Sequence, residues 1–334
     1  MQKNQIDLTI AVPVYNVEKY LRRCLDSLVG QDYESREILI VNDGSTDNSL
    51  SICREYAEKY EYIRLINQEN KGLAAVRNIC IKEARGAYIS FIDSDDYVLP
   101  GLYSHLMPML IKDHTDIMCF GFIDNYEDRA DCPDIHYSND YEEKIKRFTA
   151  AEALDEMLLP NNIDVITWNK IFKKDLFKNI SYPRDMLYED MFTNYKVIAS
   201  AEKICSTNYK FYVYCHRESS IGGMKFSEKT MSLVDAVNEV YEFAKIHGPE
   251  KPVHLNVGYT FWLVVVLNIM IRSGHKDKAY LKQTRAAVKK HFFEIWNDKY
   301  IGITRKMQLS LVLCPYMFYK AVYLRYLKTV RNKQ

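Results

Sequence analysis

The sequence predicts an α/β protein: a mostly parallel sheet flanked by helices, followed by a helical C-terminal region. Between residue 7 and about residue 122, short runs rich in β-branched residues alternate with segments that carry apolar residues at helical spacing. Strands that alternate with helices along the chain form βαβ units, whose strands are parallel. From Ser227 onward, the apolar spacing is helical throughout.

The predicted strands are short and apolar, and polar or glycine residues bound them. They are Leu8–Val14, Glu37–Asn42, Ile63–Asn67, Ala87–Ile92 and Ile117–Phe122. The predicted helices between them carry apolar residues at the i, i+3 and i+4 spacing of an amphipathic helix. They are Val17–Val29, Asn48–Tyr60, Leu73–Ala84 and Gly101–Lys112.

The alternation stops after Phe122, where we expect the polar stretch Asp124–Lys146 to be an insertion or a long loop. Further on, the pattern predicts additional elements in order. They are a helix at Ala150–Leu159, a compact segment at Thr167–Phe177, a helix from Asp190 to Ser200 and strands around Ile204–Tyr214. We therefore expect a catalytic domain over residues 1–225 and a helical domain or extension over residues 226–334.

The composition is that of an ordinary folded protein. The 334 residues are 48% hydrophobic and 27% charged, and the net charge of +1 gives no basic field for nucleic acid, so we expect no nucleic-acid partner. The eight cysteines include no CxxC pair and read as buried thiols in a reducing compartment. The N-terminal residues lack the apolar core of a secretory signal, which favours the cytoplasm.

Two segments bear on membrane contact. Tyr259–Ile271 is strongly apolar but shorter than the roughly 20 residues that span a bilayer, which favours a buried helix. Lys306–Lys328 interleaves apolar and basic residues and is interrupted by Pro315. It has two interpretations: a helix that lies on the inner face of the cell membrane, or a helix that packs on the core.

The first candidate site follows the second predicted strand, where Asp43 precedes Gly44. In sheets of this kind, ligands bind beyond the carboxyl ends of the strands. A carboxylate fixed there can accept the imide N–H of a uracil ring, and the glycine permits a close turn. The alternative is an ordinary strand-to-helix turn with Asp47 as the N-cap.

The second candidate site is acidic and follows the fourth predicted strand. Asp93, Asp95 and Asp96 lie within four residues, and their mutual repulsion needs a positive partner. A divalent cation that bridges two phosphates meets that need. Alternatively, Asp95 or Asp96 caps the helix that starts near Gly101.

Other polar segments fit an anionic ligand less specifically. Lys71-Gly72 enters a helix that carries Arg77, and both cations can face a nucleotide, although a solvated helix start explains them equally well. Glu189-Asp190 lies where a helix starts and alone reads as a dipole partner. The loop that holds Arg217 and Ser220 can close over a diphosphate or be a plain surface turn.

Taken in order, these motifs resemble those of the family 2 glycosyltransferases with the GT-A fold. The resemblance covers about residues 6 to 225. It rests on the following segments: Thr9–Asn16, Asp43–Asp47, Lys71-Gly72 with Arg77-Asn78, Asp93–Asp96 followed by Pro100-Gly101, Trp168–Lys170, and Glu189-Asp190.

The resemblance implies a role for each candidate residue. Pro13, Tyr15 and Asp43 would frame the uracil with Arg77 nearby, and Asp93 would hold the ribose or belong to the metal shell. Asp95 would ligate Mn²⁺ or Mg²⁺ on the diphosphate. Asp190 would be the general base, while Arg217 and Ser220 would contact the diphosphate.

The implied function is inverting transfer of a sugar from a UDP-sugar to a hydroxyl of a saccharide or lipid-linked saccharide, in surface polysaccharide synthesis. One alternative is a catalytically silent module that binds nucleotide sugars. Another is a sugar nucleotidyltransferase, which would need a glycine-rich, basic loop after the first strand. The segment Pro13–Asn16 is not such a loop.

Overall fold

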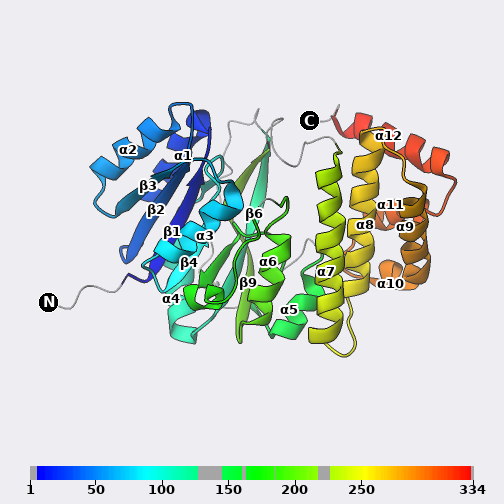
Figure 1. Cartoon of the computed structure of the whole chain (residues 1–334). Coiled ribbons are helices and arrows are strands. Elements are labelled where there is room, and N and C mark those ends of the chain that lie inside the picture. The colour runs from blue at the N-terminus through cyan, green and yellow to red at the C-terminus, as the bar shows by residue number, and fades with distance from the viewer. Residues whose placement is uncertain (1–5, 127–144, 160–162, 185, 217–225, 332–334) are drawn as a thin grey trace. The chain divides into compact units, whose positions relative to one another are not determined.

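A computed structural model describes residues 6–126, 145–159, 163–184, 186–216 and 226–331 (Figure 1). The chain divides into two compact units. Unit 1 comprises Met1–Ala153 and Val165–Ser220, and unit 2 comprises Leu154–Asp164 and Ile221–Gln334. The domain boundary expected at residue 225 lies outside the described residues, so it stays a prediction.

Unit 1 contains a single sheet, in which the described residues contribute nine strands in the order β3-β2-β1-β4-β8-β6-β9-β5, with β7 paired to β9. Their bounds are β1 Leu8–Val14, β2 Arg36–Asp43, β3 Ile63–Gln68, β4 Tyr88–Phe91, β5 Tyr97–Val98, β6 Ile117–Tyr126, β7 Ile145–Phe148, β8 Lys170–Lys173 and β9 Ile204–His216. The predicted α/β class is confirmed.

The first part of the sheet is parallel, and this places the candidate site. β1 pairs with β2 and β4, and β2 pairs with β3, all in parallel. The carboxyl ends of these strands therefore meet at one edge, where Tyr15, Asp43 and Asp93 follow. Beyond β4 the sheet is mixed, because β8 runs antiparallel to β4 and β6 while β6 and β9 pair in parallel.

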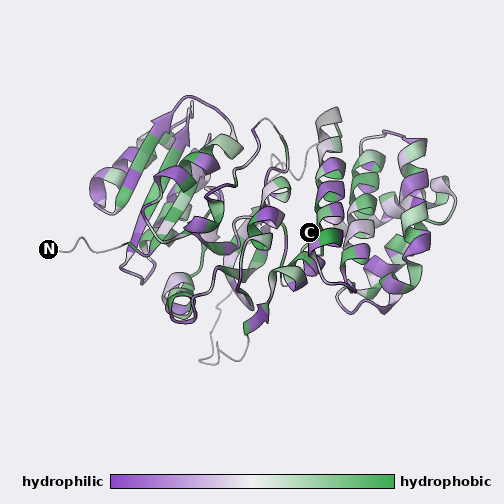
Figure 2. Ribbon diagram, turned by 60° about the horizontal axis from the view of Figure 1, so that its bottom comes forward, coloured by the Kyte–Doolittle hydropathy of each residue, from purple (hydrophilic) through white to green (hydrophobic). Residues whose placement is uncertain are grey.

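The helices of unit 1 cover this sheet with their apolar sides. α1, for example, buries Leu21, Cys24, Leu25 and Leu28, which recur at helical spacing. Figure 2 shows hydrophobic and hydrophilic residues along both the strands of the parallel part and the helices around them. The helices of unit 1 are α1 Glu18–Val29, α2 Ser49–Lys59, α3 Leu73–Glu83, α4 Leu102–Asp113, the short 3₁₀ helix η2 Lys174–Phe177 and α6 Met191–Ala199. Helix α5 Ala150–Glu156 begins in unit 1 and ends in unit 2.

The expectation of an insertion or long loop at Asp124–Lys146 is wrong at both ends of this range. β6 continues to Tyr126, which pairs with His216, and β7 begins at Ile145. Pairing with the long strand β9 supplies backbone hydrogen bonds that the polarity of these side chains does not predict. Residues 127–144 lie outside the described part.

Unit 2 is helical, as expected. It contains the 3₁₀ helix η4 Glu228–Met231 and the helices α7 Ser232–His247, α8 Leu255–Arg272, α9 Lys278–Lys290, α10 Phe292–Asn297, α11 Ile303–Leu311 and α12 Tyr316–Arg331. Among the described helices, α8 alone is long and apolar enough to cross a membrane.

α8 is longer than the segment Tyr259–Ile271 expected from sequence, since it has 18 residues. Of its apolar window, 67% is buried inside the structure. An added Cβ at Gly258 would come 2.6 Å from the Cβ of Leu158, so the helix packs closely against that segment of unit 2. This packing favours the buried-helix interpretation.

The N-terminus of α8 is held by a carboxylate from another segment. Asp155 accepts hydrogen bonds from the backbone N–H groups of Val253 at 2.9 Å, His254 at 3.0 Å and Leu255 at 2.8 Å. The first N–H groups of a helix have no partner within it, and a negative charge there also interacts favourably with the positive end of the helix dipole. Asp155 therefore ties the segment 154–164 to the core helix of unit 2.

We expect Asp155→Ala to destabilise unit 2, because it leaves buried N–H groups without acceptors. The free energy of unfolding should fall by about 2 kcal/mol, as for a lost cap with buried donors. Urea denaturation followed by circular dichroism measures the change. Asp235→Ala, at an exposed position on α7, is the matched control. It should change the free energy of unfolding by at most a few tenths of a kcal/mol. Equal effects of both variants would contradict this role of Asp155.

Candidate functional site

The loops that follow β1 and β2 are joined by side-chain hydrogen bonds. Asn16, whose φ is 51°, accepts at its Oδ1 from the N–H of Thr46 at 2.8 Å and donates its own N–H to Ser45 Oγ at 3.1 Å. Asp47 accepts from the N–H of Glu18 and of Ser49. Tyr15, half exposed at 50%, is presented by this double turn.

Asp43 is buried at the end of β2 and organises the turn that enters α3. Its Oδ1 accepts from Gln68 Nε2 at 2.6 Å and from the N–H of Lys71 at 2.9 Å, and its Oδ2 accepts from the N–H of Gly72 at 2.8 Å. Gly44 has a φ of 69°, and a Cβ there would come 2.7 Å from the backbone nitrogen of Asn70. A carboxylate has further lone pairs beyond these bonds, so a ligand N–H can still be accepted.

The acidic cluster after β4 divides into two kinds of carboxylate. Asp96 is buried and accepts from Tyr212 OH at 2.6 Å and from the N–H of Cys215 at 2.7 Å. Burial, with repulsion from Asp93, raises the pKa of Asp96 to about 7. Asp93 and Asp95 are only partly buried. Asp96 is thus a structural anchor for β9, while Asp93 and Asp95 remain partly accessible.

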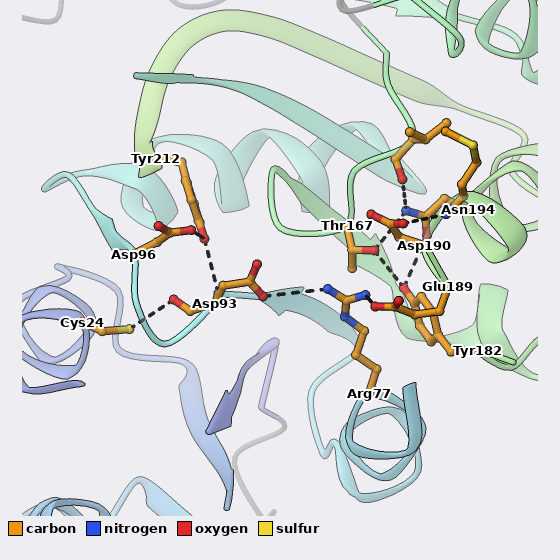
Figure 3. A network of polar contacts seen from close by, with 12 residues as sticks. Cys24, Arg77, Asp93, Asp96, Thr167, Tyr182, Glu189, Asp190, Asn194 and Tyr212 are labelled. Carbon is orange, nitrogen blue, oxygen red and sulfur yellow. Dashed lines mark hydrogen bonds and ion pairs between the residues drawn. The ribbon is translucent and has the colours of Figure 1, made fainter. Parts of the chain in front are cut away.

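Arg77 of α3 joins the acidic cluster to a segment far along the chain (Figure 3). The guanidinium is buried, with its side chain 4% exposed, and forms an ion pair with Glu189 through Nη1. Its Nη2 lies 3.8 Å from Asp93 Oδ1, and its Cζ lies 5.4 Å from the ring centroid of Tyr182. Among the described residues, its Nε has no hydrogen-bond partner. One cation thus neutralises carboxylates on either side of it.

Asp190 lies beside this ion pair at the start of α6. Tyr188, two residues earlier, has a φ of 63°, a strained value for a residue with a side chain. The Asp190 carboxylate accepts from the N–H of Met191 at 2.8 Å. Burial, followed by repulsion from Glu189, raises the pKa of Asp190 to about 7. A carboxyl group with this pKa can exchange a proton near neutral pH.

A buried network of polar groups fixes this region to α3. Asn78 holds the backbone of Tyr182 by two hydrogen bonds of 2.8 Å each. The Tyr182 hydroxyl reaches Asn194 Oδ1 and Thr167 Oγ1, both at 3.3 Å. Asn194 in turn donates to the carbonyl of Val165 at 2.7 Å and to Thr167 at 3.0 Å (Figure 3). The start of α6 is therefore held from several sides.

Stacked rings support the other side of the acidic cluster. Trp168 stacks on Tyr212 with ring centroids 4.3 Å apart and on Tyr214 with centroids 5.3 Å apart. The Tyr212 hydroxyl also accepts from the N–H of Asp93 at 3.3 Å. These rings hold Asp93 and Asp96 at fixed positions relative to β9.

The donor set suits a divalent cation that completes its shell with ligand oxygens. Within the described ranges, no group of three or more His, Cys, Asp and Glu side chains is arranged to hold a metal ion. Asp93 and Asp95, partly exposed at a strand end, supply hard oxygen ligands. Mg²⁺ and similar ions are commonly held by one or two carboxylates together with substrate phosphates. The residues therefore fit such an ion when a diphosphate is bound.

Comparison with known proteins decides the family. The sequence profile described as "Glycosyl transferase family 2" matches residues 9–181, just over half of the chain. The chain belongs to glycosyltransferase family 2. The matched range contains Asp43, Arg77 and the acidic cluster, which confirms the resemblance that the motifs predict.

This family 2 glycosyltransferase is similar to two curated relatives and to one solved structure. Glycosyltransferase GlyA of Streptococcus pneumoniae is 35% identical over 83% of the chain and 40% of its own length. Minor teichoic acid biosynthesis protein GgaB of Bacillus subtilis is 27% identical over 75% of the chain and 28% of its own length. The chain thus spans less than half of either relative.

The solved structure is residues 1–349 of TarS from S. aureus in complex with UDP-GlcNAc, with a TM-score of 0.61, 20% identity and coverage of 97% of this chain and 92% of that chain. At this identity the likeness concerns the fold. The predicted GT-A fold is confirmed.

The structure brings most of the predicted site residues to one region. Arg77 joins Asp93 to Glu189, the residue before Asp190. Pro13 is buried within β1, two residues before the exposed Tyr15. Arg217 and Ser220 lie outside the described residues. The individual roles assigned to these residues stay predictions.

The sequence names Glu189 and Asp96 but does not predict that Glu189 pairs with Arg77 or that Asp96 anchors β9. The buried groups Tyr182, Thr167 and Asn194, which hold the site together, were not predicted. Asn194 gave a signal, because it is a polar residue in the mostly apolar helix α6 and is buried there. The partnership of Arg77 with Glu189 spans 112 positions of sequence and has no local signature.

We expect Glu189→Gln to lower the pKa of Asp190 below about 7. The variant removes the negative charge that repels the Asp190 carboxylate, and it frees Arg77 to attract it. Carbon-detected NMR titration of the aspartate side chains measures this pKa. Glu202→Gln, at an exposed position, is the control and should leave it unchanged. An unchanged or raised pKa in Glu189→Gln would contradict the electrostatic role of Glu189.

Proposed function

We propose that this family 2 glycosyltransferase transfers a sugar from a UDP-sugar to a hydroxyl group of a saccharide or lipid-linked saccharide, with inversion at the anomeric carbon. The observation that supports the proposal most directly is the position of Asp190. Its carboxyl group, with a pKa of about 7, lies across the Arg77–Glu189 ion pair from the acidic cluster at the end of β4. A proton acceptor and a diphosphate site thus lie on either side of one cation.

The reaction follows from these groups. The acceptor hydroxyl forms a bond to the anomeric carbon as the bond from that carbon to the diphosphate oxygen breaks. The electron pair of the broken bond leaves with UDP, and Asp190 accepts the proton of the hydroxyl. A sugar hydroxyl is a weak nucleophile until a positioned base takes this proton.

Binding of the leaving diphosphate needs positive charge. Asp95, with Asp93, would hold Mn²⁺ or Mg²⁺, and when bound the ion supplies charge neutralisation for the leaving group. Asp93 already lies near Arg77, whose Nη2 is 3.8 Å from its Oδ1. We assign the uracil ring to Pro13, Tyr15 and Asp43, since these residues lie at the carboxyl ends of the neighbouring parallel strands β1 and β2.

Inversion is supported by the ion pair that engages Glu189, the carboxylate next to Asp190. Retention by double displacement needs a nucleophilic carboxylate besides the proton acceptor. Glu189, the carboxylate next to Asp190, is paired with the buried Arg77. Asp190 then acts as the base in a single displacement, which inverts the anomeric carbon.

The biological setting is proposed from relatives. A relative is named as a teichoic acid biosynthesis protein, and a structural neighbour was solved with UDP-GlcNAc. We assign the chain to surface polysaccharide or teichoic acid synthesis at the cytoplasmic side of the membrane.

Donor selection is testable by ligand-observed NMR of the purified protein with UDP-, GDP- and dTDP-sugars, each with and without Mn²⁺. We expect UDP-sugars to bind and Mn²⁺ to tighten binding, and Asp95→Asn to abolish the effect of the metal. Glu202→Gln, remote from the acidic cluster in sequence and exposed, serves as the control. Absence of metal-dependent UDP binding would refute the assignment of the donor.

The role of Asp190 is testable with Asp190→Asn. Asparagine caps a helix as well as aspartate does, so the fold and donor binding should persist. Transfer, or slow hydrolysis of the UDP-sugar, should fall by about 10²- to 10⁴-fold because the base is lost. In the unmodified protein the rate should rise with pH through about 7, as Asp190 ionises.

The exposed Asp175→Asn is the matched control and should retain full activity. Two results separate the alternatives. Unchanged turnover in Asp190→Asn removes Asp190 from the role of base. Donor binding without any turnover in the unmodified protein indicates a silent nucleotide-sugar binding module.

A further inference from the structure

A groove runs between α11 and α12 in unit 2, away in sequence from every residue of the candidate site. Its volume is about 180 Å³, and it is lined mainly by Met307, Leu311, Tyr319, Val322, Tyr323 and Tyr326. The lining is thus mostly apolar. Tyr319 and Tyr323 are buried, so this side of α12 packs on the unit, as one of the two interpretations from sequence requires.

The rim of this groove is exposed. Met307 and Tyr326 line it, yet they are 54% and 49% exposed. Ile303 precedes Met307 by one helical turn and is 62% exposed, and Phe318 precedes Val322 by one turn and is 53% exposed. Residues one turn apart lie on the same side of a helix. Large apolar side chains therefore gather around the groove without cover.

Helix α10 adds aromatic side chains next to α11. Phe293 is 80% exposed and Trp296 is 38% exposed. The indole Nε1 of Trp296 donates to Ser310 Oγ at 3.0 Å, and Lys306 Nζ donates to the carbonyl of Trp296 at 2.8 Å. Tryptophan is enriched where a polar phase meets a hydrocarbon phase. We define the α10–α12 surface as Phe293, Trp296, Ile303, Met307, Phe318 and Tyr326.

The charge of α11 and α12 has one sign, whereas α10 carries Glu294. No Asp or Glu follows Asp298 in the sequence. The described part of α11 and α12 carries Arg305, Lys306, Lys320, Arg325 and Lys328. Because the whole chain has a net charge of only +1, the residues before Lys299 are net negative. The positive charge is concentrated where the apolar side chains are exposed.

We propose that the α10–α12 surface binds an anionic phospholipid bilayer, with its apolar side chains among the acyl chains and its cations at the phosphates. Exposed apolar side chains alone fit several partners, whereas their combination with an acid-free cationic segment matches the charge of an anionic membrane. The groove between α11 and α12 has room for part of an acyl chain. This inference is independent of the proposed reaction.

The experiment is sedimentation of the purified full chain with vesicles of phosphatidylcholine alone, or of phosphatidylcholine mixed with phosphatidylglycerol. We expect binding to the mixed vesicles, and we expect it to weaken as salt is raised, since salt screens exposed charges. Binding that is equal for both vesicle types, or absent from both, would overturn the proposal.

Two pairs of variants locate the surface. Arg325→Gln with Lys328→Gln should weaken binding about 25-fold, since each cation near an anionic surface contributes about fivefold. The control is Lys289→Gln with Lys290→Gln, an exposed pair on α9 of equal charge. Phe318→Ser should weaken binding about tenfold, because its ring leaves the hydrocarbon. Its control is Ile246→Ser, an apolar residue on α7 that is 75% exposed.

Thermal unfolding of each variant shows whether it is folded, and all of these changes are at exposed positions. Light scattering of the chain without vesicles tests a second copy as the occupant of the surface. Suppose that the unmodified chain forms a stable dimer, that Phe318→Ser dissociates it, and that the unmodified chain does not bind vesicles. The occupant of the surface would then be a second copy of the chain and not a membrane. Equal losses in test and control pairs would also overturn the proposal.

Discussion

The buried guanidinium of Arg77 is the interaction on which the candidate site depends. Two carboxylates, Asp93 after β4 and Glu189 before α6, come together around it although they are far apart in sequence. Without a cation between them, their repulsion would drive these segments apart. Removing one partner of a buried ion pair costs about 3–5 kcal/mol, because the charge left behind has no compensation. The spacing between the acidic cluster and Asp190 is therefore set electrostatically.

The position of Arg77 depends in turn on its support. Asp43 binds the backbone at Lys71 and Gly72, which fixes where α3 begins and hence where Arg77 lies. Asn78, the next residue, holds Tyr182, whose ring lies against the guanidinium. The carboxylate at the end of β2 is thereby connected, through α3, to Arg77 and to Tyr182. Asp43 can serve the nucleotide and this scaffold together, because its bonds to the loop leave lone pairs available.

Much of this arrangement was predictable because it is encoded locally. The alternation of apolar strands with amphipathic helices predicts β1 with its observed bounds, and the acidic residues follow the strands of the parallel part. The mixed part of the sheet was not predictable in the same way. β8 pairs with β4 and β6 from a distant part of the chain, and β5 has two residues. The division of the acidic cluster between Asp96 and its neighbours depends on Tyr212 and Cys215, which no local pattern connects to it.

The stacking of Trp168 has a consequence for spectroscopy. The sequence contains three tryptophans, and Trp262 and Trp296 belong to unit 2, so Trp168 is the only indole chromophore of unit 1. Its ring lies 4.3 Å from that of Tyr212, whose hydroxyl is bonded to Asp96 and to the backbone of Asp93. Any rearrangement of the acidic cluster thus acts on the excited state of a single fluorophore. When the other two tryptophans are replaced by phenylalanine, the tryptophan fluorescence of the chain reports on that cluster without an added label.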